Sequence, residues 1–133
     1  MAPAKPLSVS IERPAAQVYE FLCLPENFPR RASVVGTGLH RAGADWLAET
    51  PEGPMTVCFS ERNSRGVLDH AVRRSSGASV YIPLRVVGNG ERCDLVLTLF
   101  RRPGMSEQEF AADSERAMRD LLAARQLLEA RRP

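Results

Sequence analysis

The first regular pattern in the chain is Leu7–Ile11, where apolar and polar residues alternate. A period of two predicts a strand with one buried face. Pro14 follows, and Val18, Phe21 and Leu22 then recur at helical spacing. Because proline is favoured at the first helical position, we expect a short amphipathic helix directly after the strand.

A second short helical turn is expected over Pro25–Ala32, with Phe28 as its apolar anchor. Pro25 ends the preceding helix near Cys23, and Pro29 limits the length of the second one. Both effects arise because proline lacks a backbone N–H and its ring clashes inside a helix. The chain therefore continues with two short helices.

From residue 34 to residue 102 the pattern changes to short segments rich in β-branched and aromatic residues. Gly, Asn, Pro and Ser separate them, which is typical of turns between antiparallel strands. Pro83 lies inside one predicted strand and favours an edge or a bulge there. The six predicted strands are Val34–Arg41, Asp45–Thr50, Met55–Arg62, Val67–Arg74, Ala78–Val87 and Arg92–Arg102.

The last segment predicts a long amphipathic helix from Glu107 to Arg131. Ser106 and Glu109 form the S-x-x-E pattern of a capping box. One face is charged, and the other carries an apolar stripe, as in a surface helix that covers a core. The stripe consists of Phe110, Ala117, Met118, Leu121, Leu122 and Leu128.

This order predicts an α+β fold in which a seven-stranded curved antiparallel sheet wraps around the long C-terminal helix. The apolar face of such a sheet must be covered, and only the long helix is large enough to cover it. Since a strongly curved sheet cannot close tightly along a helix, we expect a cavity between them. Cavities of this kind are the usual sites of small molecules.

Three stretches carry a family resemblance: Arg13–Leu22 after the first strand, Pro25–Arg30, and Phe100–Ser106 before the last helix. With the order of elements from about Leu7 to Ala130, they resemble the START-like (SRPBCC) superfamily with its helix-grip fold, and within it the polyketide cyclase/dehydrase-like group. The resemblance implies one domain over residues 1–133, with a core of about 7–130.

The resemblance also implies a hydrophobic cavity that binds lipids, polyketides, hormones or other apolar molecules. Some members of the superfamily are cyclases or dehydratases, and others are carriers or modules of larger complexes. The superfamily has no shared catalytic motif that can be carried over to this chain, so the resemblance indicates fold far more than chemistry.

Composition agrees with a globular domain. The chain has 133 residues, 44% apolar and 26% charged, which excludes a disordered, coiled-coil or collagen-like chain. Its 18 basic and 16 acidic residues are interspersed, so nucleic acid is not an expected partner. No apolar run approaches the length that a membrane span needs, so no membrane insertion is expected.

Three cysteines without a C-x-x-C motif, and no visible signal peptide, favour reduced thiols and a cytoplasmic location. The two histidines, His40 and His70, do not show the paired spacing of a metal site. We therefore expect neither a metal nor another cofactor.

Alternation assigns an inward face to each strand, taken as the more apolar one. This face comprises Leu7, Val9, Ile11, Val35, Leu39, Trp46, Ala48, Met55, Val57, Phe59, Leu68, His70, Val72, Val80, Ile82, Leu84, Val86, Leu95, Leu97 and Leu99. From these and from the helix we take the ligand-binding candidates Trp46, Met55, Phe59, His70, Phe110, Met118 and Leu121.

His70 is the candidate catalytic residue, because it shares an apolar face with Leu68 and Val72. A cavity histidine can act as a general acid or base, or can bind a ligand carbonyl. The alternative is a histidine whose hydrogen bond is purely structural. Asp69 points to the opposite face of the strand, so the two residues are not expected to form a dyad.

Tyr81 and Arg85 are two further ligand-binding candidates, with Pro83 between them on one face of a strand. If that face is inward, they form a polar clamp for an anionic or phenolic group. If the apolar face is inward, both point outward. The arginine pairs, among them Arg73-Arg74 and Arg101-Arg102, are interpreted as solvated surface.

Three functions fit these patterns. The first is binding of a small hydrophobic molecule of lipid, polyketide or aromatic type. The second is a cyclase, dehydratase or isomerase that uses His70. The third is a homodimeric interaction module whose outer sheet face includes Tyr81, Val87, Val96 and Phe100.

Overall fold

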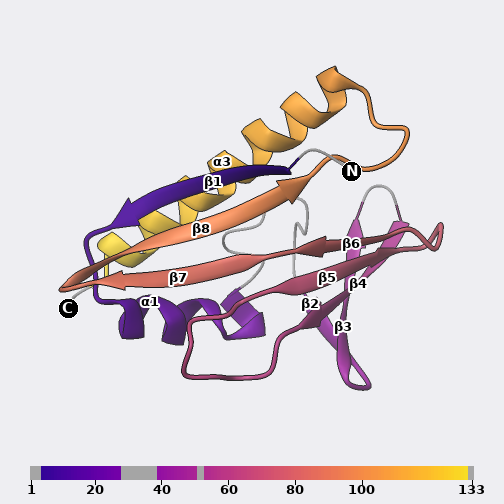
Figure 1. Ribbon diagram of the computed structural model, residues 1–133. Helices are drawn as coiled ribbons and strands as arrows, with labels where there is room; N and C mark the ends of the chain where they lie inside the picture. Colours follow the sequence, from indigo (N-terminus) through magenta and orange to yellow (C-terminus); the bar gives the residue numbers. More distant parts are fainter. Residues whose placement is uncertain (1–3, 28–38, 51–52, 132–133) are drawn as a thin grey trace.

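The computed structural model describes residues 4–27, 39–50 and 53–131, which form two antiparallel sheets and two α-helices (Figure 1). The first sheet has the order β1-β8-β7, formed by Ala4–Ile11, Arg92–Phe100 and Leu84–Asn89. The second is a meander of Leu39–Ala42 (β2), Asp45–Thr50 (β3), Gly53–Phe59 (β4), His70–Arg74 (β5) and Ser79–Ile82 (β6).

The expected single seven-stranded sheet is wrong, and Pro83 is where it divides. The predicted strand Ala78–Val87 forms β6 before this proline and β7 after it. Ile82 pairs with His70 in the second sheet, whereas Leu84 pairs with Leu97 in the first. Because proline has no N–H to donate to a ladder, the strand changes partners there.

Several strands are shorter than their hydrophobic patterns predict. β4 ends at Phe59 and β5 begins at His70. Val67 and Leu68 bond to the backbone of β7 instead of β4, since Val67 forms a bridge with Arg85 and Leu68 N donates to Leu84 O (2.7 Å). Asn63 accepts a hydrogen bond from Val67 N (3.1 Å) and donates one to Val67 O (2.9 Å). Such bonds from asparagine to nearby backbone compete with sheet pairing. The last predicted strand likewise ends at Phe100 and not at Arg102.

The helices follow their sequence signals closely. Helix α1 spans Ala15–Leu22 and begins after Pro14. Helix α3 spans Glu107–Glu129, and its capping box is formed: Ser106 Oγ accepts from Glu109 N (3.1 Å), and Glu109 Oε1 accepts from Ser106 N (3.0 Å).

The second predicted helix is described only in part. A 3₁₀ turn (η1) covers Pro25–Asn27, and the rest of the Pro25–Ala32 prediction lies outside the described residues. The same holds for the first part of the predicted strand Val34–Arg41, of which β2 is the described end.

Two separate hydrophobic clusters result from the division of the sheet. The larger joins β1, β7, β8, α1 and α3, and it includes Ile11, Val18, Leu84, Leu95 and Leu128, all of them almost fully buried. The smaller, Ala48, Met55, Val57 and Val72, lies on the second sheet. Figure 1 shows α3 running along β1 and β8, while β2, β3 and β4 extend beyond the helix. Burial of these faces confirms the inward assignments for β1, β7 and β8.

Candidate ligand cavity

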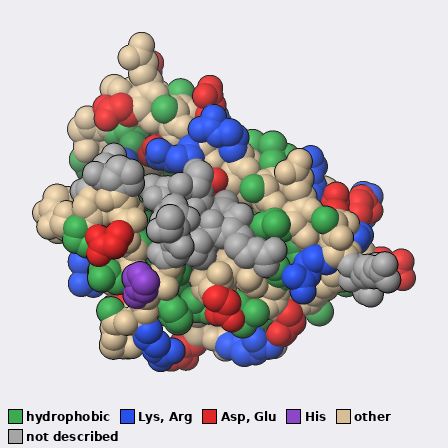
Figure 2. Space-filling model, turned by 180° about the vertical axis from the view of Figure 1, so that it is seen from behind, with side chains coloured by type: hydrophobic (Ala, Val, Ile, Leu, Met, Phe, Trp, Pro, Cys, Tyr) green, Lys and Arg blue, Asp and Glu red, His purple; other side chains and the backbone are tan. Residues whose placement is uncertain are grey.

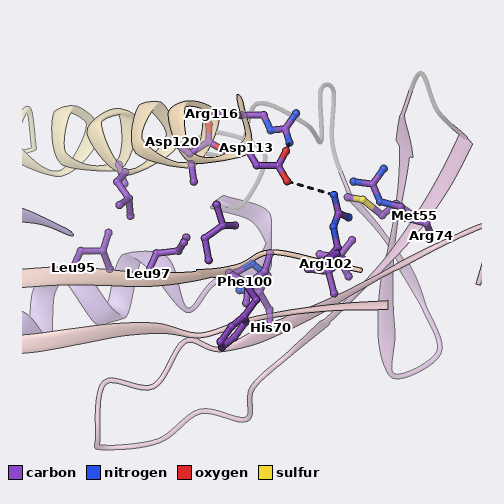
Figure 3. Close-up of a pocket in the computed structure, with 17 residues that line it drawn as sticks. Met55, His70, Arg74, Leu95, Leu97, Phe100, Arg102, Asp113, Arg116 and Asp120 are labelled. Atoms are coloured by element: carbon purple, nitrogen blue, oxygen red, sulfur yellow. Dashed lines mark hydrogen bonds and ion pairs between the residues drawn. The ribbon is translucent and has the colours of Figure 1, made fainter. Parts of the chain in front are cut away.

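A cavity of about 140 Å³ lies where the two hydrophobic clusters meet. Strands β4, β5, β6 and β8 and helix α3 contribute its wall (Figure 3). The apolar lining consists of Met55, Val72, Val80, Ile82, Leu95, Leu97, Leu99, Phe100, Ala117, Leu121 and Ala124. The split sheet thus leaves an apolar space that neither cluster fills.

The two ends of the cavity differ in burial and charge. At the inner end Leu95, Leu121 and Ala124 are almost completely buried. Besides His70, the remaining lining is charged and comprises Arg74, Arg102, Asp113, Arg116 and Asp120, all of intermediate exposure. An apolar pocket with a few polar groups at one end is suited to holding and orienting an organic ligand.

Asp113 organises the charged end. Its carboxylate bridges two arginines, with Arg102 Nη2 3.4 Å from Oδ2 and Arg116 donating to Oδ1 (Figure 3). Arg116 and Asp113 are three residues apart on α3, a spacing that brings side chains together on a helix. Arg102 comes from the segment after β8, so the bridge ties that segment to the helix.

His70 contributes the imidazole of the cavity wall. The residue is only 4% exposed, and its Nδ1 lies 3.2 Å from Leu68 O. A carbonyl oxygen only accepts, so Nδ1 carries a proton, and in the neutral ring Nε2 is then an acceptor. The ring of Phe59 lies 6.1 Å from that of His70, centroid to centroid. His70 is therefore an oriented polar group in an apolar wall.

Asp69, the neighbour of His70 in the chain, makes its side-chain hydrogen bonds on the opposite face of the sheet. Its carboxylate accepts hydrogen bonds from Tyr81 Oη (2.6 Å), Leu84 N (2.9 Å) and Arg85 Nε and Nη2 (both 2.9 Å). The Arg85 guanidinium, together with the Tyr81 hydroxyl and the Leu84 N–H, holds the pKa of this carboxyl well below its usual range. Tyr81 and Arg85 therefore lie outside the cavity, and the separation of Asp69 from His70 matches the expected alternation.

The other candidate residues are divided among several places. Met55 and Leu121 line the cavity with His70, whereas Phe59 lines a second pocket of about 180 Å³ beside α1. Trp46 is half-buried on β3, with the Arg41 guanidinium 5.7 Å from the centre of its ring. Met118 packs against the larger hydrophobic cluster, and Phe110 is half-buried near the start of α3.

The charged end of the cavity was missed by the sequence interpretation. Arg74 continues the inward alternation of Leu68, His70 and Val72, a signal that could have separated it from Arg73. Arg102 gave no such signal, because it follows the end of β8 at Phe100. Two arginines that are adjacent in the chain are therefore not equivalent in the fold: Arg74 and Arg102 line the cavity, and Arg73 and Arg101 do not.

The rest of the described structure adds three observations. Cys23, Cys58 and Cys93 are free thiols. Among the described residues, no group of three or more His, Cys, Asp or Glu is placed to hold a metal ion, and none of the helices found there is long and apolar enough to cross a membrane. Acidic and basic side chains are interspersed on the face shown in Figure 2.

Comparison with known proteins identifies the fold. No family model and no curated protein matches the sequence. An uncharacterized protein from Bacillus thuringiensis has a similar structure, with a TM-score of 0.75 at 11% identity, over 95% of this chain and 98% of that one. A START superfamily protein from Mycobacterium smegmatis has a TM-score of 0.72 at 9% identity, over 96% and 97% of the two chains.

A third similar structure is the Zhui aromatase/cyclase of a Streptomyces species. Its TM-score is 0.71 at 15% identity, and the alignment covers 98% of this chain and 96% of that chain. These similarities confirm the START-like, polyketide cyclase-like fold that the sequence resembles. At such low identity they show the fold alone.

Proposed function

We propose that this chain, which has the START-like fold, binds a small apolar molecule in the cavity between its sheets and α3. The observation that supports this most directly is the apolar inner end, where Leu95, Leu121 and Ala124 enclose unfilled space. Removing apolar surface from water stabilises a complex by roughly 25 cal/mol per Å². A space of this kind therefore favours an apolar occupant over water.

The size of the cavity limits the apolar part of the ligand. Its volume of about 140 Å³ is close to that of an engineered cavity, about 150 Å³, that binds benzene. The cavity as a whole therefore suits one ring or a short alkyl chain, and a larger ligand would extend past the charged end.

The first prediction is that filling the cavity weakens binding. Ala117 is a residue of α3 that lines the cavity, so Ala117→Trp places an indole ring in the space for the ligand. We expect toluene and 1-hexanol to shift the NMR signals of cavity-lining methyl groups saturably in the native protein, and to bind at least tenfold more weakly to the variant.

Ala111→Trp is the matched control, because Ala111 is an exposed position of the same helix and does not line the cavity. It should bind both probes like the native chain. If Ala117→Trp does not fold, Ala117→Leu provides a smaller obstruction. Binding that is absent in the native chain, or equally weak in both tryptophan variants, would contradict the proposal.

A second candidate function is catalysis by His70, as in a cyclase, dehydratase or isomerase. The observation in its favour is the oriented imidazole in the cavity wall. It is supported less than binding, since Asp69 faces away and does not orient the ring. Molecules that co-purify with the chain can be identified by mass spectrometry and incubated with it. Turnover lost in His70→Ala with binding retained would favour the enzyme, and weaker binding alone would favour the carrier.

A further inference from the structure

Three arginines that are far apart in the sequence line the charged end of the cavity. Arg74 is the last residue of β5, Arg102 lies two residues beyond β8, and Arg116 belongs to α3. In Figure 3, Arg102 and Arg116 lie on either side of Asp113, and Arg74 lies beyond Arg102 near Met55. The fold therefore brings three guanidinium groups to the end of the cavity where a polar group of the ligand would lie.

The acidic groups at the same end do not cancel this charge. Two carboxylates, Asp113 and Asp120, line the cavity with the three guanidiniums, so the described lining has an excess of one positive charge. Hydrogen bonding with Ser106 in the capping box lowers the pKa of Glu109, and the nearby Arg102 charge lowers it further, but the Glu109 carboxylate does not line the cavity.

Arg102 is the arginine best placed to bind an additional anion. Its contact with Asp113 is 3.4 Å long, whereas strong charge-assisted bonds are about 2.7–2.9 Å. Asp113 also has Arg116 as a partner, so it stays paired if Arg102 turns to a ligand. A guanidinium has five N–H donors in a planar fork that fits a carboxylate. Arg102 is 34% exposed, so a ligand can approach it from solvent.

We infer that the natural ligand is an amphipathic monocarboxylate. Its ring or short chain occupies the space beside Leu95 and Leu97, and its carboxylate lies at Arg102, with Arg74 and Arg116 adding positive charge. This inference rests on the proposed binding function and adds the chemical class and orientation of the ligand. A single negative charge neutralises the excess of one positive charge at this end, whereas a dianion such as a phosphate monoester would leave it with a net negative charge.

The test compares matched pairs of probes that differ only in the charged group. Benzoate, 3-phenylpropanoate and 5-phenylpentanoate are each titrated beside the corresponding alcohol, with NMR chemical shifts as the readout. Within the best pair we expect the carboxylate to bind at least tenfold more tightly than its alcohol. Because the advantage is electrostatic, it should fall as the salt concentration rises.

Arginine variants locate the carboxylate. Arg102→Gln should weaken carboxylate binding about tenfold and change alcohol binding less than twofold, and Arg74→Gln and Arg116→Gln should each have a smaller effect in the same direction. Arg73→Gln and Arg119→Gln are matched controls, because both residues are exposed neighbours of the lining arginines and do not line the cavity. Thermal denaturation of each variant shows that it is folded.

The outcomes separate the two proposals. Tighter carboxylate binding that depends on Arg102 supports the inference. If each alcohol binds as tightly as its carboxylate, or if Arg73→Gln and Arg102→Gln act alike, the inference is overturned and the binding function stands. If neither member of any pair binds, both proposals fail.

Discussion

Asp69 shows how the hydrogen bonds of one buried side chain stabilise the point where the chain passes from one sheet to the other. Its side chain is 4% exposed, and it binds Tyr81 before Pro83 as well as Leu84 N and Arg85 after it. The carboxylate thus accepts a hydrogen bond from the Leu84 N–H at the point where the strand changes partners. A buried charge is tolerated there because four donors compensate for its lost hydration.

The pH dependence of stability should reveal this carboxylate. The pKa of Asp69 is lower in the folded chain than the unfolded value of about 3.9, so its contribution is present above that pH and is lost as the pH falls below it. We expect Asp69→Asn to cost about 2 kcal/mol at pH 7. At pH 3, urea denaturation should show a difference in the free energy of unfolding between the variant and the native chain that is smaller by roughly 1 kcal/mol.

Tyr81→Phe is the control for this prediction, because it removes one hydrogen bond and leaves the carboxylate with Arg85. It should cost about 1 kcal/mol at pH 7 and keep most of the acid dependence. An equal stability difference for Asp69→Asn at pH 3 and pH 7 would show that this carboxylate does not have a lowered pKa.

At the scale of the elements, the turns decide how closely the strands can approach. Gly66 has a φ of +72°, and a Cβ there would lie 2.5 Å from Val86 O. Val86 N donates to Gly66 O (2.9 Å), so the two backbones are joined directly. Gly77, in the turn between β5 and β6, has a φ of +92° but open space around its Cβ position. Of these two glycines, only Gly66 has packing that adds to the conformational requirement.

The two glycines therefore make a matched pair. Gly77→Ala should cost about 1 kcal/mol, since an L-residue is strained by roughly that amount in the left-handed region. Gly66→Ala should cost about 3 kcal/mol, because overpacking against backbone adds to the strain. Chemical denaturation of both variants measures the difference, and equal losses would mean that the Val86 contact is easily relieved.

At the scale of the whole molecule, the C-terminal end of α3 is hydrogen-bonded to Glu12 and Arg13, which follow β1. Arg13 Nη2 donates to Glu129 O (2.6 Å) and Arg131 O (3.0 Å), and Glu129 Oε2 accepts from Glu12 N (2.9 Å). These bonds join the segment after β1 to the last turn of the helix. A guanidinium also suits this position because the C-terminus of a helix carries partial negative charge.

Removing this link should loosen the end of the helix. We expect Arg13→Ala to cost about 1–2 kcal/mol and to speed amide hydrogen exchange in the last turn of α3. Arg92→Ala serves for comparison, because Arg92 makes an exposed ion pair with Glu12 (3.2 Å) that should contribute less than about 0.5 kcal/mol. Similar losses in both variants would argue against a special role for Arg13.

The strands, the helices and their buried faces could be predicted because the signals for them are local. Alternation placed Leu95 and Leu97 on the inward face, and the capping box located the start of α3. These patterns depend on residues a few positions apart, and one sequence contains them completely. The boundaries near Phe59 and Phe100 were less accurate, because strand ends depend on pairing with other strands.

Only the tertiary structure decided the features that depend on distant partners. The sequence by itself determined an α+β chain with an apolar sheet face and a covering helix, since period and capping are properties of neighbouring residues. It did not determine that the sheet divides at Pro83, because the partners of Ile82 and Leu84 lie in different parts of the chain. Nor did it bring Arg74, Arg102 and Arg116 to one end of a cavity, because that convergence exists only once β5, β8 and α3 have packed.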